Sequence, residues 1–265
     1  MELQLGDVQT TALIPLAIKA NETLRSNARI KDEKAVEIIR ALKVDTKPYD
    51  KFLSHEGVIA RTIMLDRSLK EIIKKNPESV IVNLGAGFDN RFSRVDNGKI
   101  RWFDLDLPDM ISARKKAFPE RERVTMITGS ILENDWCSEI RKEGLSDKGR
   151  YVFLAEGLFM YFTLDEIGKF LTILKENFPE GGILIAEQNS KLLCKHEKQH
   201  DTVRNTNAHF RSGTESAKEI AALVDGINLL EEHSFNEEMT KYSIRAKIFA
   251  ALLPQANDRW ATFEF

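Results

Sequence analysis

The chain has 265 residues, of which 42% are hydrophobic and 30% are charged, and it carries a formal net charge of -2. This balance is typical of a folded globular protein and excludes a chain that is disordered throughout. A net charge near zero provides no overall field that would attract nucleic acid or an anionic membrane, so we expect neither partner.

Cysteine content and hydropathy indicate the compartment. Only Cys137 and Cys194 are present, which is too few for a disulfide framework and favours a reducing environment. The first residues include Glu2 and Asp7 and lack the basic segment of a signal peptide, and no apolar run reaches the roughly 18 residues of a membrane helix. The sequence therefore predicts a soluble, cytoplasmic protein.

The predicted elements begin with helices. Residues 32–42 and 59–75 each place apolar side chains on one helical face, and the second run ends before Pro77. Together with the residues before them, these runs predict an N-terminal helical cap over about residues 1–76.

Short runs rich in β-branched and aromatic residues follow. They predict seven strands, at residues 79–84, 100–105, 124–127, 151–155, 183–186, 228–232 and 260–265. Helices are predicted from the capping box at Thr163–Glu166 to Phe178 and over 217–224. This alternation is typical of an α/β fold with a doubly wound, mostly parallel sheet, and the pattern of the last run suits an antiparallel C-terminal strand. We expect residues 1–265 to form a single domain.

One segment interrupts the alternation. Residues 189–215 are polar and weakly periodic, and they contain three of the five histidines. We interpret this segment as a lid or insertion over the carboxyl edge of the sheet, where ligands bind in open α/β folds.

The first predicted strand runs into Gly85-Ala-Gly87, whose glycines allow a sharp turn and a close approach of the backbone to a ligand. Asp104 and Asp106 lie 19 and 21 residues beyond Gly85, a spacing at which an acidic side chain reaches ribose hydroxyl groups in nucleotide-binding folds. Both aspartates project from one face of a strand, so the hydroxyl groups of a ligand would satisfy them. The alternative is that both are solvated at the end of the strand.

The residues after this loop argue against a dinucleotide. A dinucleotide site has Gly or Ala three residues after the second glycine, but this chain has Asn90 there, with Asp89 beside it. An anionic residue at this place repels a pyrophosphate and suits a ligand with sulfonium and ammonium cations, such as S-adenosylmethionine. Glu156 follows the fourth predicted strand, so we expect it near the methionine end of the cofactor or at the floor of an acceptor pocket.

Three ordered motifs carry a family resemblance. LGAGFDNR at 84–91, FDLDLP at 103–108 and AEGLFMYFTLDE at 155–166 resemble the leucine carboxyl methyltransferase superfamily, which includes the polyketide-synthesis O-methyltransferases of the tetracenomycin type. The resemblance extends from about Thr11 to the final strands. It implies a Rossmann-like class I methyltransferase that uses S-adenosylmethionine to methylate an oxygen atom, in particular a carboxylate of a small metabolite or of a protein C-terminus.

The motifs and the resemblance together give the expected cofactor-binding residues, which are Lys19, Arg61, Gly85, Gly87, Asp104, Asp106, Ser130, Ile131 and Glu156. By the resemblance, Arg61 would pair with the methionine carboxylate and Asp106 would hold the ribose. Ser130-Ile131 stands where the family commonly has Asp-Leu beside the adenine, so the expected carboxylate is missing there.

The same resemblance shapes the expected mechanism. An acceptor carboxylate is already ionised at neutral pH and needs no general base. We therefore expect catalysis by proximity and alignment, with Glu156 and Tyr161 shaping the site rather than removing a proton.

Two other kinds of protein remain as alternatives. Residues 196–200 form an HExxH string, which on a helix could hold zinc for a metallopeptidase, with the glutamate as general base. Val203 and Thr206 stand where a metzincin has Gly and His, so we expect no metal. The other alternative is a protein that binds S-adenosylmethionine without catalysis. The sequence does not predict the oligomeric state.

Overall fold

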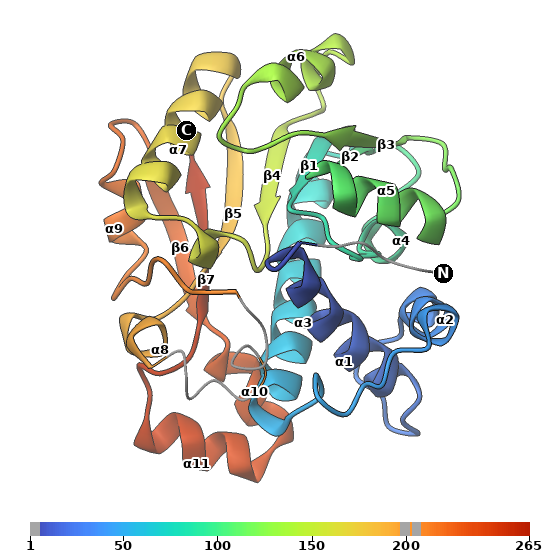
Figure 1. Cartoon of the computed structure of the whole chain (residues 1–265). Helices are drawn as coiled ribbons and strands as arrows, with labels where there is room; N and C mark the ends of the chain where they lie inside the picture. Colours follow the sequence, from blue (N-terminus) through green and yellow to red (C-terminus); the bar gives the residue numbers. More distant parts are fainter. Residues whose placement is uncertain (1–5, 197–201, 203–207) are drawn as a thin grey trace.

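The computed structural model describes residues 6–196, 202 and 208–265. Its centre is a seven-stranded sheet in the order β3-β2-β1-β4-β5-β7-β6 (Figure 1). The strands are β1 Val80–Leu84, β2 Arg101–Asp106, β3 Val124–Thr128, β4 Tyr151–Ala155, β5 Gly182–Gln188, β6 Asn228–Ser234 and β7 Arg259–Glu264.

Strands β1 to β5 pair in parallel, whereas β7 is antiparallel to both of its neighbours, β5 and β6. The parallel strand β4 therefore points down in Figure 1 while β7 points up. The predicted seven strands, the mostly parallel sheet and the antiparallel C-terminal strand are confirmed.

The helices are α1 Leu13–Thr23, α2 Glu33–Leu42, α3 Phe52–Lys75, α4 Phe92–Val95, α5 Pro108–Ala117, α6 Asp135–Lys142, α7 Leu164–Asn177, α8 Lys191–Lys195, α9 Lys218–Ala221, α10 Asn236–Tyr242 and α11 Ile244–Leu252, with short 3-10 turns η1 Gln9–Ala12 and η2 Phe159–Tyr161. The predicted capping box is present, because Thr163 Oγ1 accepts from the Glu166 amide and the Glu166 carboxylate accepts from the Thr163 amide. The predicted helix over 217–224 is shorter than expected, and α10 and α11 were not predicted.

The two faces of the sheet are covered by different helices. Val80, Val82 and Leu84 of β1 pack with α6, α7 and α9, whereas Ile81 of the same strand packs with α3, α4 and α10. Alternate side chains of one strand thus enter two cores, which is why the strand is apolar on both faces.

Helices α1, α2 and α5 share a third apolar cluster beside the sheet, and α1 crosses the carboxyl edge next to α3 (Figure 1). This arrangement places α1 and the first half of α3 where ligands bind in open α/β sheets.

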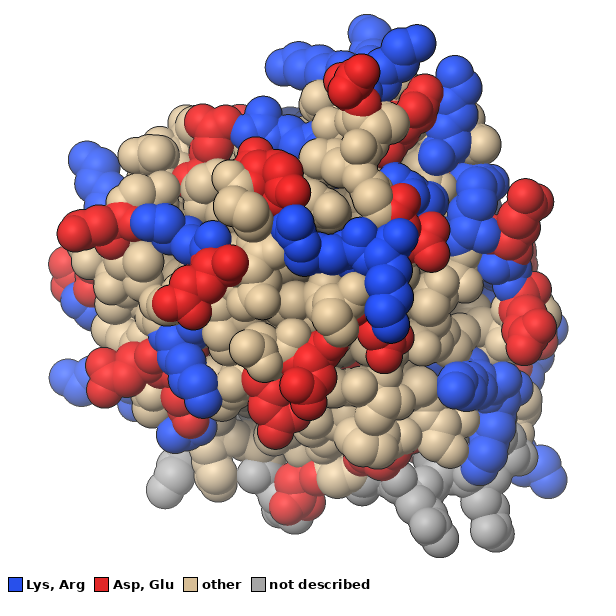
Figure 2. Space-filling view, turned by 90° about the horizontal axis from the view of Figure 1, so that it is seen from above, with Lys and Arg blue, Asp and Glu red and all other residues tan. Residues whose placement is uncertain are grey.

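The surface offers no single-sign patch on the side that Figure 2 shows. On that face, Lys and Arg side chains intermingle with Asp and Glu side chains. Among the described residues, no helix has the length and apolar character required to cross a membrane.

Candidate functional site

A cavity of ≈ 760 Å³ opens at the carboxyl edge of the sheet, between the strand ends and helices α1, α3 and α8. Most of the residues predicted from the sequence line it together: Lys19, Arg61, Gly85, Gly87, Asp106, Ser130, Ile131, Glu156 and Tyr161. The fold therefore brings segments that are far apart in the sequence to one place.

The glycine loop after β1 adopts a backbone that suits glycine. Gly85 has a φ of 61° and Gly87 a φ of 47°, both in the left-handed region. A Cβ atom at Gly85 would lie 2.8 Å from Cδ1 of Leu158, so a side chain there would displace this neighbour. The Asp106 carboxylate accepts hydrogen bonds from the amides of Gly87 and Leu107, each at 2.8 Å, and so joins the end of β2 to the loop. Burial raises the pKa of Asp106.

Asp104 departs from its expected role as a cofactor contact, because it is not among the residues that line the cavity. Its buried carboxylate accepts from Trp102 Nε1 at 2.9 Å and from Arg114 Nη2 at 2.5 Å. Arg114 also donates to the carbonyl oxygen atoms of Gly87 and Asp89, at 2.7 and 3.0 Å. Asp104 therefore holds Arg114, and Arg114 holds the backbone of the glycine loop.

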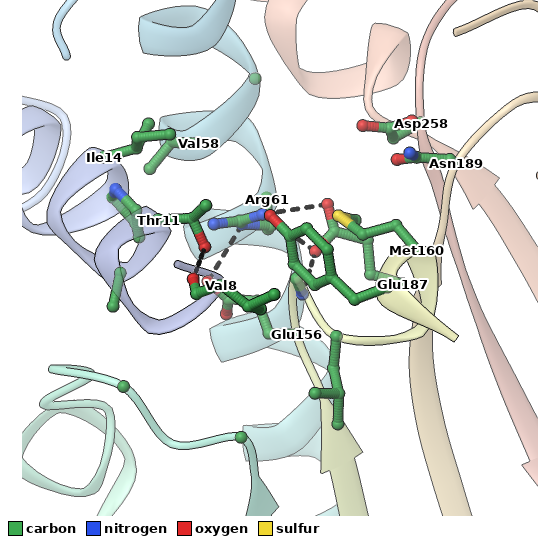
Figure 3. A pocket seen from close by; sticks show the side chains of 18 of the residues that line it. Val8, Thr11, Ile14, Val58, Arg61, Glu156, Met160, Glu187, Asn189 and Asp258 are labelled. Carbon is green, nitrogen blue, oxygen red and sulfur yellow. Dashed lines mark hydrogen bonds and ion pairs between the residues drawn. The ribbon is translucent and has the colours of Figure 1, made fainter. Parts of the chain in front are cut away.

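Arg61 lies at the centre of an ion network. Its Nε atom is 3.0 Å from Oε1 of Glu156, and its Nη1 atom is 2.9 Å from Oε2 of Glu187 (Figure 3). The second oxygen of Glu156 lies 2.5 Å from Nη2 of the fully buried Arg91. Burial acts to raise the pKa of Glu156, but the positive charges of Arg91 and Arg61 outweigh it and lower this pKa to about 2.

The charge of Asp89 is also compensated. Its carboxylate lies 2.9 Å from Nζ of Lys19, 3.1 Å from Nη1 of Arg91 and 3.4 Å from Nη2 of Arg94. These cations overcome burial and hold the pKa of Asp89 well below its usual range. Asp89 is therefore ionised but neutralised by its surroundings, which weakens the expectation that its charge alone selects a cationic ligand.

Ser130 and Ile131 follow β3 and line the same cavity. The Ser130 carbonyl accepts from Trp136 Nε1 at 3.1 Å, and the Ser130 hydroxyl accepts from the Leu132 amide at 3.2 Å. Ile131 is buried against Trp136 and the strand residues of the core. This part of the cavity therefore combines the Ser130 hydroxyl group with the apolar side chain of Ile131, which suits a flat ring.

Tyr161 lines the cavity from η2, with its ring centroid 6.1 Å from that of Phe210. Burial raises the pKa of its phenol, against the effect of a hydrogen bond with Thr11. The phenol of Tyr161 is therefore protonated at neutral pH.

The sequence analysis did not single out the cavity residues Glu187, Asn189 and Asp258, or Arg114, which pairs with Asp104. Glu187 could have been found by the rule that found Glu156, because both stand at the carboxyl ends of parallel strands. Its pKa is raised by burial, although Arg61 opposes that shift. Arg91 belongs to the LGAGFDNR motif but was assigned no role, and Arg114 lies in no motif; each contributes through the carboxylates that it holds.

Most of the HExxH string lies outside the described residues. His196 follows α8 and lines the cavity, but Glu197 to His200 are not described. Within the described ranges, no group of three or more His, Cys, Asp or Glu side chains could hold a metal ion.

The sequence matches known proteins. The profile described as leucine carboxyl methyltransferase matches residues 12–174, more than half of the chain. The chain is 24% identical over 234 residues to the tetracenomycin polyketide synthesis O-methyltransferase TcmP of Streptomyces glaucescens, covering 88% of this chain and 84% of that protein. It is also 24% identical over 200 residues to the S-adenosyl-L-methionine-dependent methyltransferase dpfgK of Gibberella zeae, covering 69% of this chain and 65% of that protein.

Solved structures share the fold. A candidate methyltransferase from Thermobifida fusca superposes with a TM-score of 0.60 at 10% identity and covers 95% of this chain and 93% of its own. The magnesium protoporphyrin IX methyltransferase ChlM of Synechocystis, solved with bound S-adenosylhomocysteine, superposes with a TM-score of 0.51 at 10% identity, covering 88% of this chain and 93% of its own.

Proposed function

Because the chain belongs to the leucine carboxyl methyltransferase family and is an S-adenosylmethionine-dependent methyltransferase, we propose that it methylates a carboxylate oxygen of a small organic acceptor. The O-methyltransferase among its relatives supports transfer to oxygen, and the family supports a carboxylate as the methylated group. The acceptor of the tetracenomycin relative belongs to polyketide synthesis, which supports a small molecule over a protein C-terminus.

The observation that carries this proposal is a cavity whose lining combines charged and apolar residues. Arg61, Asp106 and Glu156 are among its charged residues. Ile14, Val58 and Met160 are among its apolar residues, and Figure 3 shows them around Arg61 and Glu156. A cavity of ≈ 760 Å³ lies within the range of about 300–1,000 Å³ that is typical of small-molecule sites.

The charged residues of the lining fit the cofactor. Asp106 stands at the end of β2 with its carboxylate on the cavity, where it can accept from ribose hydroxyl groups. Arg61 and Lys19 offer cations to a methionine carboxylate, and Glu156 offers an anion to its ammonium group. Ser130 and Ile131 would lie against the adenine.

The chemistry requires alignment more than proton transfer. When bound, S-adenosylmethionine supplies an electrophilic methyl group on a sulfonium. The acceptor oxygen forms the new bond to this carbon as the carbon–sulfur bond breaks, and the sulfur keeps that electron pair. No proton moves if the acceptor is an ionised carboxylate, so the protein mainly has to hold both molecules in line.

The test uses the purified protein with tritiated S-adenosylmethionine and a panel of carboxylic acids, alcohols and phenols. Base-labile methyl esters should form from acids, and calorimetry should show binding of S-adenosylhomocysteine but not of NAD. Transfer only to hydroxyl groups, or binding of NAD without response to either sulfur nucleotide, would contradict the proposal.

A further inference from the structure

Two polar residues at the carboxyl edge of the sheet, Asn189 and Asp258, take no part in the ion pairs of Arg61. Gln188 of β5 pairs with Arg259 of β7, so the next step along both strands places Asn189 opposite Asp258. Both residues line the cavity, and Figure 3 shows their side chains next to each other. Alternation along β5 puts Asn189 on the same face as Glu187.

The hydrogen-bonding groups of these two residues are largely unused. Asn189 is 2% exposed, and within the described part of the chain neither its amide nitrogen nor its amide oxygen has a hydrogen-bond partner. Oδ1 of Asp258 is buried and likewise has no partner among the described residues, although the Ser190 amide donates to the carboxyl group. Buried polar groups in native proteins nearly always have a hydrogen-bond partner, and a bound molecule in the cavity would supply one here.

The backbones of both residues are fixed, in contrast to their free side-chain atoms. The Asn189 carbonyl accepts from the Thr214 amide at 2.9 Å, and the Asp258 carbonyl accepts from the Phe235 amide at 3.1 Å. Neither residue needs to reorganise its main chain to present its side chain to the cavity. This is the arrangement expected of groups that fix the orientation of a ligand.

The cavity that contains the pair has apolar side chains that reach the surface. Val8, Leu107, Leu192 and Leu253 all line the cavity and are nevertheless between 40% and 48% exposed. Large apolar side chains at the rim of a cavity are typical of a binding site for an apolar molecule.

We propose that Asn189 and Asp258 recognise the acceptor, and that this acceptor is an apolar carboxylic acid whose carboxylate accepts hydrogen bonds from both side chains. The inference rests on the proposed function and adds the residues and the class of acid. The Asn189 amide supplies N–H donors, and the Asp258 carboxyl supplies an O–H donor when it is protonated.

The charges around Asp258 favour its protonated form. Burial, together with the nearby negative charge of Glu187, raises the pKa of Asp258 to about 8, against the effects of Arg61, the Ser190 amide and Arg259. The phenol of Tyr161 also lies within electrostatic range of Asp258 and is itself protonated at neutral pH. A neutral Asp258 can therefore donate to an acceptor carboxylate, and this donation ends when Asp258 ionises.

The experiment measures binding to the protein loaded with S-adenosylhomocysteine, using biphenyl-4-carboxylate and decanoate as probes and 4-phenylphenol as the hydroxyl analogue. Asn189→Ala and Asp258→Ala should each weaken binding of the acids by about tenfold or more, the scale of a lost hydrogen bond to a charged group. Affinity for S-adenosylhomocysteine should not change. Asp147→Asn, at an exposed position, is the control for a lost carboxylate.

Asp258→Asn separates a hydrogen-bond donor from a base, because asparagine still donates but cannot take a proton. We expect this variant to retain binding and methyl transfer, and to remove the loss of acid binding that wild-type protein shows as the pH rises through about 8. Loss of transfer in Asp258→Asn, with wild-type rates that climb with pH and a preference for 4-phenylphenol, would overturn the inference in favour of a base acting on a hydroxyl group.

The remaining outcomes distinguish the two proposals. If methyl esters form but the Asn189→Ala and Asp258→Ala variants bind and react like wild type, the recognition pair is wrong and the proposed function stands. If neither acid binds the loaded wild-type protein, the acceptor class is wrong. If S-adenosylhomocysteine itself does not bind, the proposed function fails.

Discussion

The Nε atom of Arg61 lies 3.0 Å from Oε1 of Glu156, so helix α3 is joined directly to the loop after β4 at the floor of the cavity. The two charges reach this contact from residues that are far apart in the sequence. An arginine side chain presents several donors in a fixed plane, which a lysine cannot reproduce.

Arg61→Lys should therefore weaken binding of S-adenosylhomocysteine by about 1–3 kcal/mol, the scale for losing hydrogen bonds to charged groups. Calorimetry measures this directly. Arg67→Lys is the matched control on the same helix, since Arg67 is 58% exposed and pairs with Glu238 outside the cavity. Equal affinities in wild type and Arg61→Lys, with unchanged circular dichroism, would remove Arg61 from the cofactor site.

Asp104 and Asp106 should respond differently to the same substitution. Asp106→Asn removes the charge that we propose binds the ribose and should lower cofactor affinity by about 1–3 kcal/mol with little change in stability. Asp104→Asn breaks the buried pair with Arg114 and should lower the free energy of unfolding by about 3–5 kcal/mol. Urea unfolding and calorimetry on both variants test this, and the same pattern in both would contradict it.

These two aspartates also mark the limit of the sequence analysis. Their spacing from Gly85 and their alternation along the strand predicted that both would contact the cofactor, but only Asp106 lines the cavity. The sequence could not say that Arg114, ten positions after Asp104 and on a helix, reaches back to Asp104 and to the carbonyls of the glycine loop. Such a partner is fixed by packing between α5 and the sheet, not by a local pattern.

The fold was predicted more fully than the site, because strand patterns are local. Helices α10 and α11 are exceptions. In α11, Ile244 and Leu252 are 77% and 74% exposed, so its apolar side chains do not form the buried face that apolar periodicity normally indicates. Asn189 and Asp258 were missed for a related reason, because only the pairing of β5 with β7 brings them together.

His55 should make stability depend on pH. Its Nδ1 atom lies 2.7 Å from Asp50 Oδ1 and its Nε2 atom 3.0 Å from Glu22 Oε2, next to Nη1 of Arg25 at 3.1 Å. Burial opposes the charged form, but the two carboxylates outweigh it and raise the pKa of His55 above 6.5. Its contribution is therefore complete below about pH 6.5 and is lost as the pH rises through the higher pKa of the folded state.

Urea unfolding of wild type and His55→Gln from about pH 5.5 to about pH 9 measures this contribution. The advantage of wild type over the variant should be largest at the acid end of that range and should shrink as the pH rises. A difference that is constant with pH would show that His55 does not gain charge on folding. Below this pH range the free energy of unfolding should fall for a second reason. The pKa of Glu22 is lowered to about 2 in the folded protein, so the stability that its charge contributes is lost as the pH falls towards that value.

The HExxH string should have no role in metal binding or transfer. The double variant His196→Ala, His200→Ala should keep the wild-type metal content, measured by plasma mass spectrometry, and most of its methyl transfer. Stoichiometric zinc in the wild-type protein that disappears in the double variant would restore the metallopeptidase hypothesis.

The position of β7 has a consequence for folding kinetics. In chain order β6 precedes β7, yet β7 lies between β5 and β6 in the sheet, so β6 joins the sheet only through β7. Until residues 259–264 insert, β5 has one unpaired edge and β6 has no partner. Pairing between distant segments is slow, and an exposed strand edge can pair with another chain. The refolding chain should therefore be most prone to aggregation in the interval before β7 inserts, and substitutions that weaken this one strand should lower the yield of refolded protein more than their effect on final stability suggests.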